Sequence, residues 1–271
     1  MDYVISDENL IEKLLSRQLS SGVSPLESIF TPVFDCFYGE ISAYRAFVRI
    51  NSVISGALNP ADYGDADLSG DTITNLAYAI IGKAADAKKA FQKAGINFKW
   101  LSFKVPSALL NDDNFYNKIK IILDLKNTDG SKICLEFDVS VMERSAEKLA
   151  GWFNDIKAAG LTVAVSGYGG EKFPMEKMLK ACPDYLFADK SVARLSVDRE
   201  KRGAIAPIIN FARSLGAEVI PCGIASDEQL REFKTRDCAA FLPEKDYHGN
   251  LVLNTQSLSL EEILKRGEVN V

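Results

Sequence analysis

Histidine and cysteine, the usual zinc ligands, are scarce in this sequence of 271 residues. It contains a single histidine, His248, and five cysteines, none of which stands in a C-x-x-C pair. The cysteines are Cys36, Cys134, Cys182, Cys222 and Cys238. A zinc site needs several such ligands at short spacing, so this class of metal protein is not expected. An odd number of separated cysteines also argues against a disulfide scaffold and fits the reducing cytoplasm.

Long apolar runs and an excess of basic charge are also missing. No run reaches the roughly 20 apolar residues that span a bilayer. The acidic start "MDYVISDENL" lacks the basic and apolar segments of a signal peptide, so we expect a cytoplasmic protein. A net charge of −5 argues against binding to a nucleic-acid polymer. With 47% hydrophobic and 25% charged residues, the chain has the composition of a globular protein with a substantial core.

The N-terminal part of the sequence predicts a helix followed by a β-hairpin. Apolar residues at helical spacing follow Ser6, and two β-rich runs lie on either side of "FYGE". The predicted elements are, in order, a helix over 10–19, hairpin strands over 28–36 and 40–50, a loop over 55–71 and a helix over 72–94. The loop is assigned because this stretch is rich in Gly, Asp and Pro.

A regular alternation of strands and helices follows. The strand-like runs lie at 98–104, 132–138, 162–166, 184–187, 217–222 and 238–242. Helical stripes lie between them, and Ser226 with Gln229 forms a capping box. Eight strands predict an α/β fold of the closed (β/α)8 type, here with an antiparallel first strand because the fold opens with a hairpin. An open doubly wound sheet is the alternative, although no G-x-G-x-x-G turn supports it.

The functional residues of such a barrel lie at the C-terminal ends of its strands. These ends carry Lys104, Glu136, Asp138, Ser166, Gly167, Asp189 and Cys222, and the second hairpin strand adds Arg45 and Arg49. We expect Tyr168 to pack over the mouth of the barrel. Cys222 is expected to be an inert core thiol, because no histidine lies near it in the sequence.

The order of these segments resembles the EAL-domain family, the cyclic di-GMP phosphodiesterases. The resemblance covers residues 25 to 243 and rests on a series of short matches. In this sequence, "FTPVFDCFYGEISAYRAFVRI" resembles the opening hairpin of the family, and "LSFKVPSALL" resembles its Asn-bearing strand. "ICLEFDVS" corresponds to the family motif Glu-x-Thr-Glu-Ser, and "GLTVAVSGYGG" corresponds to Asp-Asp-Phe-Gly. "PDYLFADKSVA" corresponds to Asp-x-Leu-Lys-Ile-Asp, and "GAEVIPCGIASDEQL" corresponds to Ala-Glu-Gly-Val-Glu-Thr. The resemblance implies a barrel in which acids and an Asn hold Mg²⁺ or Mn²⁺, which activates water against a phosphodiester.

The catalytic residues that the resemblance implies are nearly all replaced. By position, the signature Glu falls on Arg45, the metal-binding Asn on Lys104, the Asp-Asp pair on Ser166 and Gly167, the catalytic Lys on Phe187, and two further Glu on Cys222 and Val139. Glu136, Asp189 and Arg49 remain. Two metal ions need several hard oxygen ligands, and cations at ligand positions repel them. We therefore expect no metal cofactor and no catalytic residue.

The candidate ligand-binding residues at the barrel mouth are Arg45, Arg49, Lys104, Glu136 and Asp189. In one interpretation, Arg45 and Lys104 neutralise the two acids, since a buried carboxylate without a metal needs a partner. In the other, the cations receive a ligand phosphate. The first interpretation predicts that Arg45 lies within salt-bridge distance of Glu136 or Asp189.

The sequence thus predicts a helical extension over 1–24, a degenerate EAL-like barrel over 25–243 and a tail with a short helix over 244–271. The function implied by the resemblance is that of a catalytically inactive EAL-like protein of bacterial cyclic di-GMP signalling, which acts by binding a protein partner. The alternatives are a cyclic di-GMP receptor without hydrolysis and an active phosphodiesterase with relocated residues. A homodimer is left open.

Overall fold

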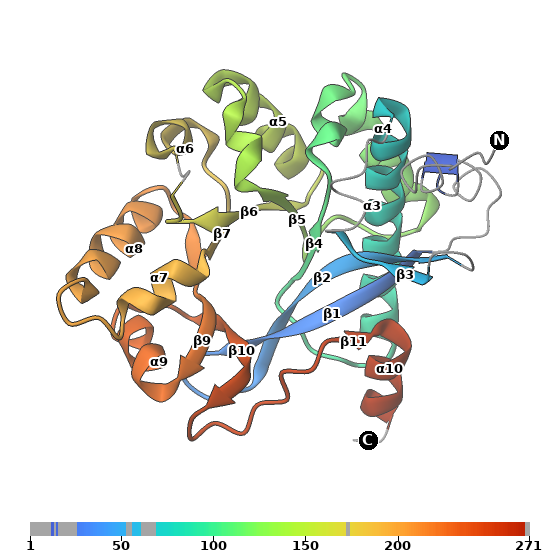
Figure 1. The fold of residues 1–271 in the computed structure, drawn as a ribbon. Coiled ribbons are helices and arrows are strands. Elements are labelled where there is room, and N and C mark those ends of the chain that lie inside the picture. Colours follow the sequence, from blue (N-terminus) through green and yellow to red (C-terminus); the bar gives the residue numbers. More distant parts are fainter. Residues whose placement is uncertain are drawn as a thin grey trace, which may run out of the picture.

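A computed structural model of the chain describes residues 12–13, 15, 26–52, 56–60, 69–171 and 174–268 (Figure 1). The predicted extension over 1–24 lies outside the described residues, apart from residues 12, 13 and 15. The same holds for most of the helix predicted over 10–19. The fold below therefore begins with the hairpin.

The strands form one sheet that curls into a nearly closed barrel (Figure 1). Its main strands are β1 (Leu26–Asp35), β2 (Ile41–Ser52), β4 (Leu101–Lys104), β5 (Ile133–Asp138), β6 (Thr162–Tyr168), β7 (Tyr185–Ala188), β8 (Glu218–Ile220), β9 (Cys222–Ser226) and β10 (Ala240–His248). β2 pairs antiparallel with β1 and parallel with β4, and parallel pairing continues from β4 to β8. β10 returns to β1, so the barrel is confirmed and the open sheet is wrong.

The strand predicted over 217–222 is divided at Pro221. Proline has no backbone N–H to give to a ladder, so continuous pairing stops there. β8 pairs with β7 before the proline, and β9 pairs with β10 after it. The carbonyl oxygen of Pro221 still accepts a hydrogen bond from the backbone N–H of Leu242. This change of partner brings β10 beside the last strand of the parallel series.

Helices surround the outside of the barrel (Figure 1). They are α3 (Gly70–Lys93), α4 (Phe115–Leu125), α5 (Ala146–Ala158), α6 (Met175–Ala181), α7 (Lys190–Leu195), α8 (Ile205–Ser214) and α9 (Asp227–Lys234), with short 3₁₀ turns η1 (Ser107–Asn111), η2 (Val139–Glu143) and η3 (Arg202–Ala204). The predicted cap of α9 is confirmed, because the Ser226 side chain accepts from the Gln229 N–H. In the described part of the chain, no helix has the length and hydrophobicity needed to cross a membrane.

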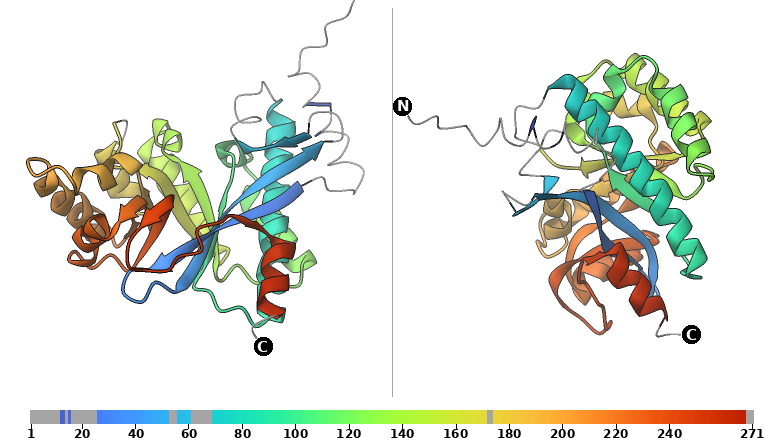
Figure 2. Two further views of the ribbon diagram at one scale, coloured as in Figure 1. Left: turned by 60° about the horizontal axis from the view of Figure 1, so that its bottom comes forward. Right: turned by 90° about the vertical axis from the view of Figure 1, so that its right-hand side faces the viewer.

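Two short strands lie outside the predicted pattern. β3 (Gly56–Leu58) pairs with β2 inside the stretch predicted as a loop over 55–71. β11 (Leu258–Ser259) pairs with β1 and leads directly into α10 (Leu260–Glu268), the short helix expected in the tail. α10 lies beside α3 on the outer face of the hairpin (Figure 2). The C-terminal segment thereby covers an edge of β1 that β10 leaves open.

The apolar core has an outer and an inner part. The outer part lies between sheet and helices, and the inner part fills the barrel. The inner residues are Val33, Ala43, Trp100, Cys134, Ala164, Phe187, Ile220, Cys222, Ala240 and Leu242. Trp100 packs edge-on against Phe187, with ring centroids 5.9 Å apart. The interior is thus a packed core beneath the C-terminal ends of the strands.

Tyr168 does not pack over the barrel mouth, as the sequence had suggested. It belongs to the outer core, and its hydroxyl donates to the carbonyl oxygen of Ile208 on α8. The cause is a bulge in β6, where Ser166 pairs with Phe187 but Tyr168 pairs with the next residue, Ala188. Gly167 between them has a positive φ of 87°. An extra residue at a bulge reverses the side-chain alternation, which sends Tyr168 outward.

We predict that Gly167→Ala lowers the free energy of unfolding by about 2 kcal/mol, because an L side chain is strained at this φ. The added Cβ would also lie 3.1 Å from Cγ1 of Val139. Gly151→Ala is the control, since Gly151 lies inside α5 with no atom within 4 Å of an added Cβ. It should leave stability equal or raise it by up to about 1 kcal/mol. Urea denaturation measures both variants, and equal effects would contradict the bulge argument.

Candidate functional site

The centre of the barrel mouth is an ion pair between β2 and β5. Arg45 Nε donates to Oε2 of Glu136 at 2.8 Å, and Arg45 Nη2 donates to Oε1 at 2.5 Å. Ser102 on β4 adds a third hydrogen bond to Oε2 at 3.2 Å. Side chains alternate along a strand, and Tyr44 and Ala46 belong to the outer core, so Arg45 between them faces the barrel interior. The prediction that Arg45 lies within salt-bridge distance of Glu136 or Asp189 is confirmed for Glu136.

An aromatic ring supports this pair from below. The Arg45 guanidinium carbon lies 4.7 Å from the ring centroid of Phe187, a cation–π contact. Glu136 is fully buried, while 30% of the Arg45 side chain is exposed. Burial opposes the charge on Arg45, but the Glu136 carboxylate outweighs it, so the pKa of the guanidinium is raised. The guanidinium therefore stays charged, and the Glu136 side chain beside it has no contact with solvent.

Cys222 lies among the inner core residues near this pair. Only 7% of the residue is exposed, and its thiol donates to the carbonyl oxygen of Ile220. Burial raises the pKa of Cys222 to about 12. The thiol stays protonated at neutral pH, which agrees with the expected inert core residue.

Lys104 and Asp189 do not form the pairs that the sequence had suggested. Lys104 Nζ lies 3.6 Å from Oδ2 of Asp138, and roughly half of each side chain is exposed. Asp189 is the N-cap of α7, and its carboxylate accepts a hydrogen bond from the Ser191 N–H at 2.8 Å. Hydrogen bonding from Ser191 lowers the pKa of Asp189. Local geometry explains both outcomes. Lys104 is the register partner of Glu136 on β5, so Asp138 lies only two residues farther along that strand. The carboxylate of Asp189 turns toward the helix that it caps.

Arg49 lies farther along β2, at the upper rim. Its Nη2 donates to Oε2 of Glu27 at 2.6 Å, and Asn51 Nδ2 donates to the same oxygen at 2.9 Å. These hydrogen bonds lower the pKa of Glu27. Sequence reasoning missed Glu27, although its position opposite Arg49 follows from the hairpin register. The rim thus holds a further ion pair, with about one third of each side chain exposed.

The described side chains at the barrel mouth do not suit a divalent metal ion as ligands. Both carboxylate oxygens of Glu136 accept hydrogen bonds from Arg45, so a metal at this acid would have to displace a guanidinium. In the stretches of chain that the structure describes, no three His, Cys, Asp or Glu side chains gather as a metal site. Beside Lys104 and Asp138 lies a cavity of about 310 Å³ that also contacts Arg144. The mouth can therefore offer charged hydrogen-bond donors, but no cluster of hard anionic ligands.

Comparison with known proteins identifies relatives by sequence. A family model for the EAL domain matches residues 14–242. An uncharacterized signaling protein of Caulobacter vibrioides is 22% identical over 230 residues, which covers 83% of this chain and 28% of that protein. The chain thus spans just over a quarter of the length of this curated relative.

Solved structures of low sequence identity share the fold. An EAL domain protein from Listeria monocytogenes has a TM-score of 0.73 at 19% identity, covering 99% of this chain and 100% of that one. The PaMucR phosphodiesterase in complex with c-di-GMP has a TM-score of 0.75 at 14% identity, covering 94% and 99%. The FimX EAL domain from Pseudomonas aeruginosa bound to c-di-GMP has a TM-score of 0.71 at 13% identity, covering 84% and 91%.

We predict that Arg45→Ala lowers the free energy of unfolding by about 3–5 kcal/mol, because it leaves Glu136 buried and unpaired. The matched control is Arg49→Ala on the same strand and the same face. It breaks a partly exposed pair and should cost less than about 1 kcal/mol. Guanidinium chloride denaturation in metal-free buffer measures both variants.

A double variant separates the lost charge pair from lost packing. Arg45→Met with Glu136→Leu removes both charges, so it should be more stable than Arg45→Ala alone. If the double variant were as unstable as Arg45→Ala, the unpaired acid would not be the cause of the loss.

Proposed function

Because this chain belongs to the EAL domain family, we propose that it takes part in cyclic di-GMP signalling as a catalytically inactive domain that acts by binding a protein partner. The observation that carries the proposal is the Arg45–Glu136 pair. A carboxylate that could serve a metal is bound on both oxygens to a guanidinium. The same arrangement underlies our proposal that the domain works without Mg²⁺ or Mn²⁺.

The neighbouring positions support the inactive assignment. Phe187 presents a ring where the resemblance implies a catalytic lysine, and Cys222 presents a protonated thiol where it implies a glutamate. Asp189, the remaining acid, caps α7. Activation of water by metal ions requires several oxygen ligands around a shared site, and these residues offer one paired carboxylate at the centre.

Exposed apolar side chains support the binding of a protein partner. At the turn between β1 and β2, Phe37 is 53% exposed and Tyr38 is 80% exposed. Val252 in the C-terminal segment is fully exposed. Aromatic residues are enriched in protein interfaces, and tyrosine is one of the residue types common among the few that carry most of the binding energy. We propose this turn as part of the contact surface.

We predict that the purified chain produces no linear dinucleotide from cyclic di-GMP with Mg²⁺ or Mn²⁺ present. Chromatography of the nucleotides after overnight incubation measures this, with the PaMucR phosphodiesterase assayed in parallel as the active control. Turnover that depends on added metal and is lost in Glu136→Gln would show that the acid at the mouth serves catalysis, and would end the proposal.

A second candidate function is a receptor that binds cyclic di-GMP without hydrolysing it. The FimX EAL domain, a structural neighbour, is bound to this nucleotide, and Arg49 offers a guanidinium at the rim. Calorimetric titration with cyclic di-GMP distinguishes the two candidates. Under the leading proposal we expect no saturable heat. Saturable binding that weakens at least tenfold in Arg49→Ala, but not in Arg213→Ala on the distant helix α8, would favour the receptor.

A further inference from the structure

The C-terminal segment is attached to the barrel on either side of an exposed connection. Before the connection, the Asn250 N–H donates to the Asp227 carboxylate at the start of α9, at 2.8 Å. Val252 is then fully exposed, and the described residues 252–257 form neither helix nor strand. Residues 252–268, called the C-terminal strap below, are therefore joined to a fixed point at Asn250 through a connection that regular structure does not stiffen.

After the connection, the strap contacts the hairpin over a short distance. The two residues of β11 pair with β1, and beside them the hydroxyl oxygens of Thr31 and Ser257 lie 2.8 Å apart at the surface. Of the strap side chains that the structure describes, those of Leu258 and Ile263 are buried, with 9% and 6% of the residue exposed. The attachment thus includes one short strand pairing and little buried apolar surface.

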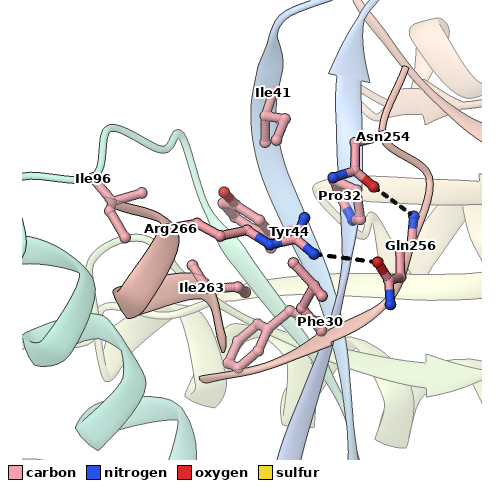
Figure 3. A pocket seen from close by; sticks show the side chains of 10 residues that line it. Phe30, Pro32, Ile41, Tyr44, Ile96, Asn254, Gln256, Ile263 and Arg266 are labelled. Carbon is pink, nitrogen blue, oxygen red and sulfur yellow. Dashed lines mark hydrogen bonds between the residues drawn. The ribbon is translucent and has the colours of Figure 1, made fainter. Parts of the chain in front are cut away.

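Several polar contacts of the strap join its own residues. The Ser259 N–H and hydroxyl both donate to the Glu262 carboxylate, at 2.7 and 2.8 Å. Arg266 Nη2 donates to Oε1 of Gln256 at 3.2 Å, which ties α10 to the connection before β11 (Figure 3). These hydrogen bonds stay intact when the strap moves away from the hairpin. They keep the strap together but do not attach it to the barrel.

Two cavities lie beside α10 and reduce its contact with the barrel. One, of about 310 Å³, lies between β1, β2 and Ile263 of α10 (Figure 3). The other, of about 550 Å³, lies between Leu26 of β1, α3 and Leu264 of α10. Atoms that line a cavity lack neighbours on one side, so they gain less dispersion energy than atoms of a close-packed core. The packing beneath α10 is therefore incomplete on both sides.

We propose that the strap is a releasable cover: residues 252–268 leave the hairpin as one unit while the barrel stays folded. Segments that bury little apolar surface open at a lower free energy than the core. Opening uncovers the outer edge of β1 together with Leu26 and Phe30, which are 4% and 0% exposed while the strap is in place. The strap thereby controls access to an apolar face of the hairpin. This face lies away from the barrel mouth, so the inference does not depend on the proposed function.

Hydrogen exchange of the full chain, followed residue by residue by NMR in native buffer, tests the release. We expect the amides of β11 and α10 to exchange about a hundredfold faster than those of β5, or more. The β1 amides that bond to β11 should exchange at the same rate as the strap, because one opening event exposes both. Strap amides that exchange as slowly as β5 would overturn the proposal. Fast exchange confined to α10, with β1 still protected, would also overturn it, since that pattern is fraying of a helix end.

A matched pair of substitutions tests the apolar contact. Ile263→Ala removes a buried side chain from the contact, so the strap and the edge of β1 should open about tenfold more often. Ile121→Ala is the control, because this isoleucine lies on α4 and is 55% exposed. It should leave exchange in the strap unchanged. Equal effects of the two substitutions would contradict an opening that breaks the contact of Ile263.

A disulfide across the contact should hold the cover closed. Thr31→Cys with Ser257→Cys places two thiols where the hydroxyl oxygens lie 2.8 Å apart. With the disulfide formed, exchange of β11 and of the β1 amides that bond to it should slow about tenfold or more, because the open state loses chain entropy. Reduction with dithiothreitol should restore the faster exchange. Unchanged exchange in the oxidised protein would show that these amides are exposed by another motion, and would end the proposal.

Discussion

The interaction on which the mouth of this barrel depends is the two-fold hydrogen-bonded pair of Arg45 and Glu136. A fully buried carboxylate without a partner is costly, and the guanidinium of Arg45 is the cation that pairs with Glu136 here. The presence of a guanidinium at this position restricts which residues can lie next to it. A lysine in place of Phe187 would put a second positive charge beneath Arg45, whereas the ring offers a favourable face. Arg45, Glu136 and Phe187 therefore fit one another as a set.

The sequence could predict those features that follow from local pattern or from strand register. Ser226 was recognisable as a helix cap from its spacing to Gln229, and Arg45 and Glu136 could be placed at one mouth because parallel strands present their ends together. The position of Tyr168 could not be predicted in this way. It depends on a bulge at Gly167, and a left-handed glycine changes the alternation without leaving a mark in the hydrophobic pattern.

The choice of partner by a charged side chain was a second feature that the sequence could not predict. Lys104 had three acids within plausible reach and pairs with Asp138, while the carboxylate of Asp189 bonds to the N–H of its own helix. Sequence gives the candidates for such choices but not the distances that decide them. The strands β3 and β11 escaped prediction for a different reason. They are three and two residues long, too short for any periodicity, and exist because β2 and β1 offer them an edge.

The closure of the barrel has a consequence for the order in which the protein folds. β1 is the first of the main strands, yet its remaining edge is covered by β10 and β11, which the ribosome makes after the other described strands. Until they emerge, the growing chain carries a long apolar strand with unpaired N–H and C=O groups, which is a template for association with other chains. Contacts between such distant segments also form slowly. The topology therefore requires that this edge be protected from association during synthesis. A chain truncated before β10 would keep the edge of β1 unpaired.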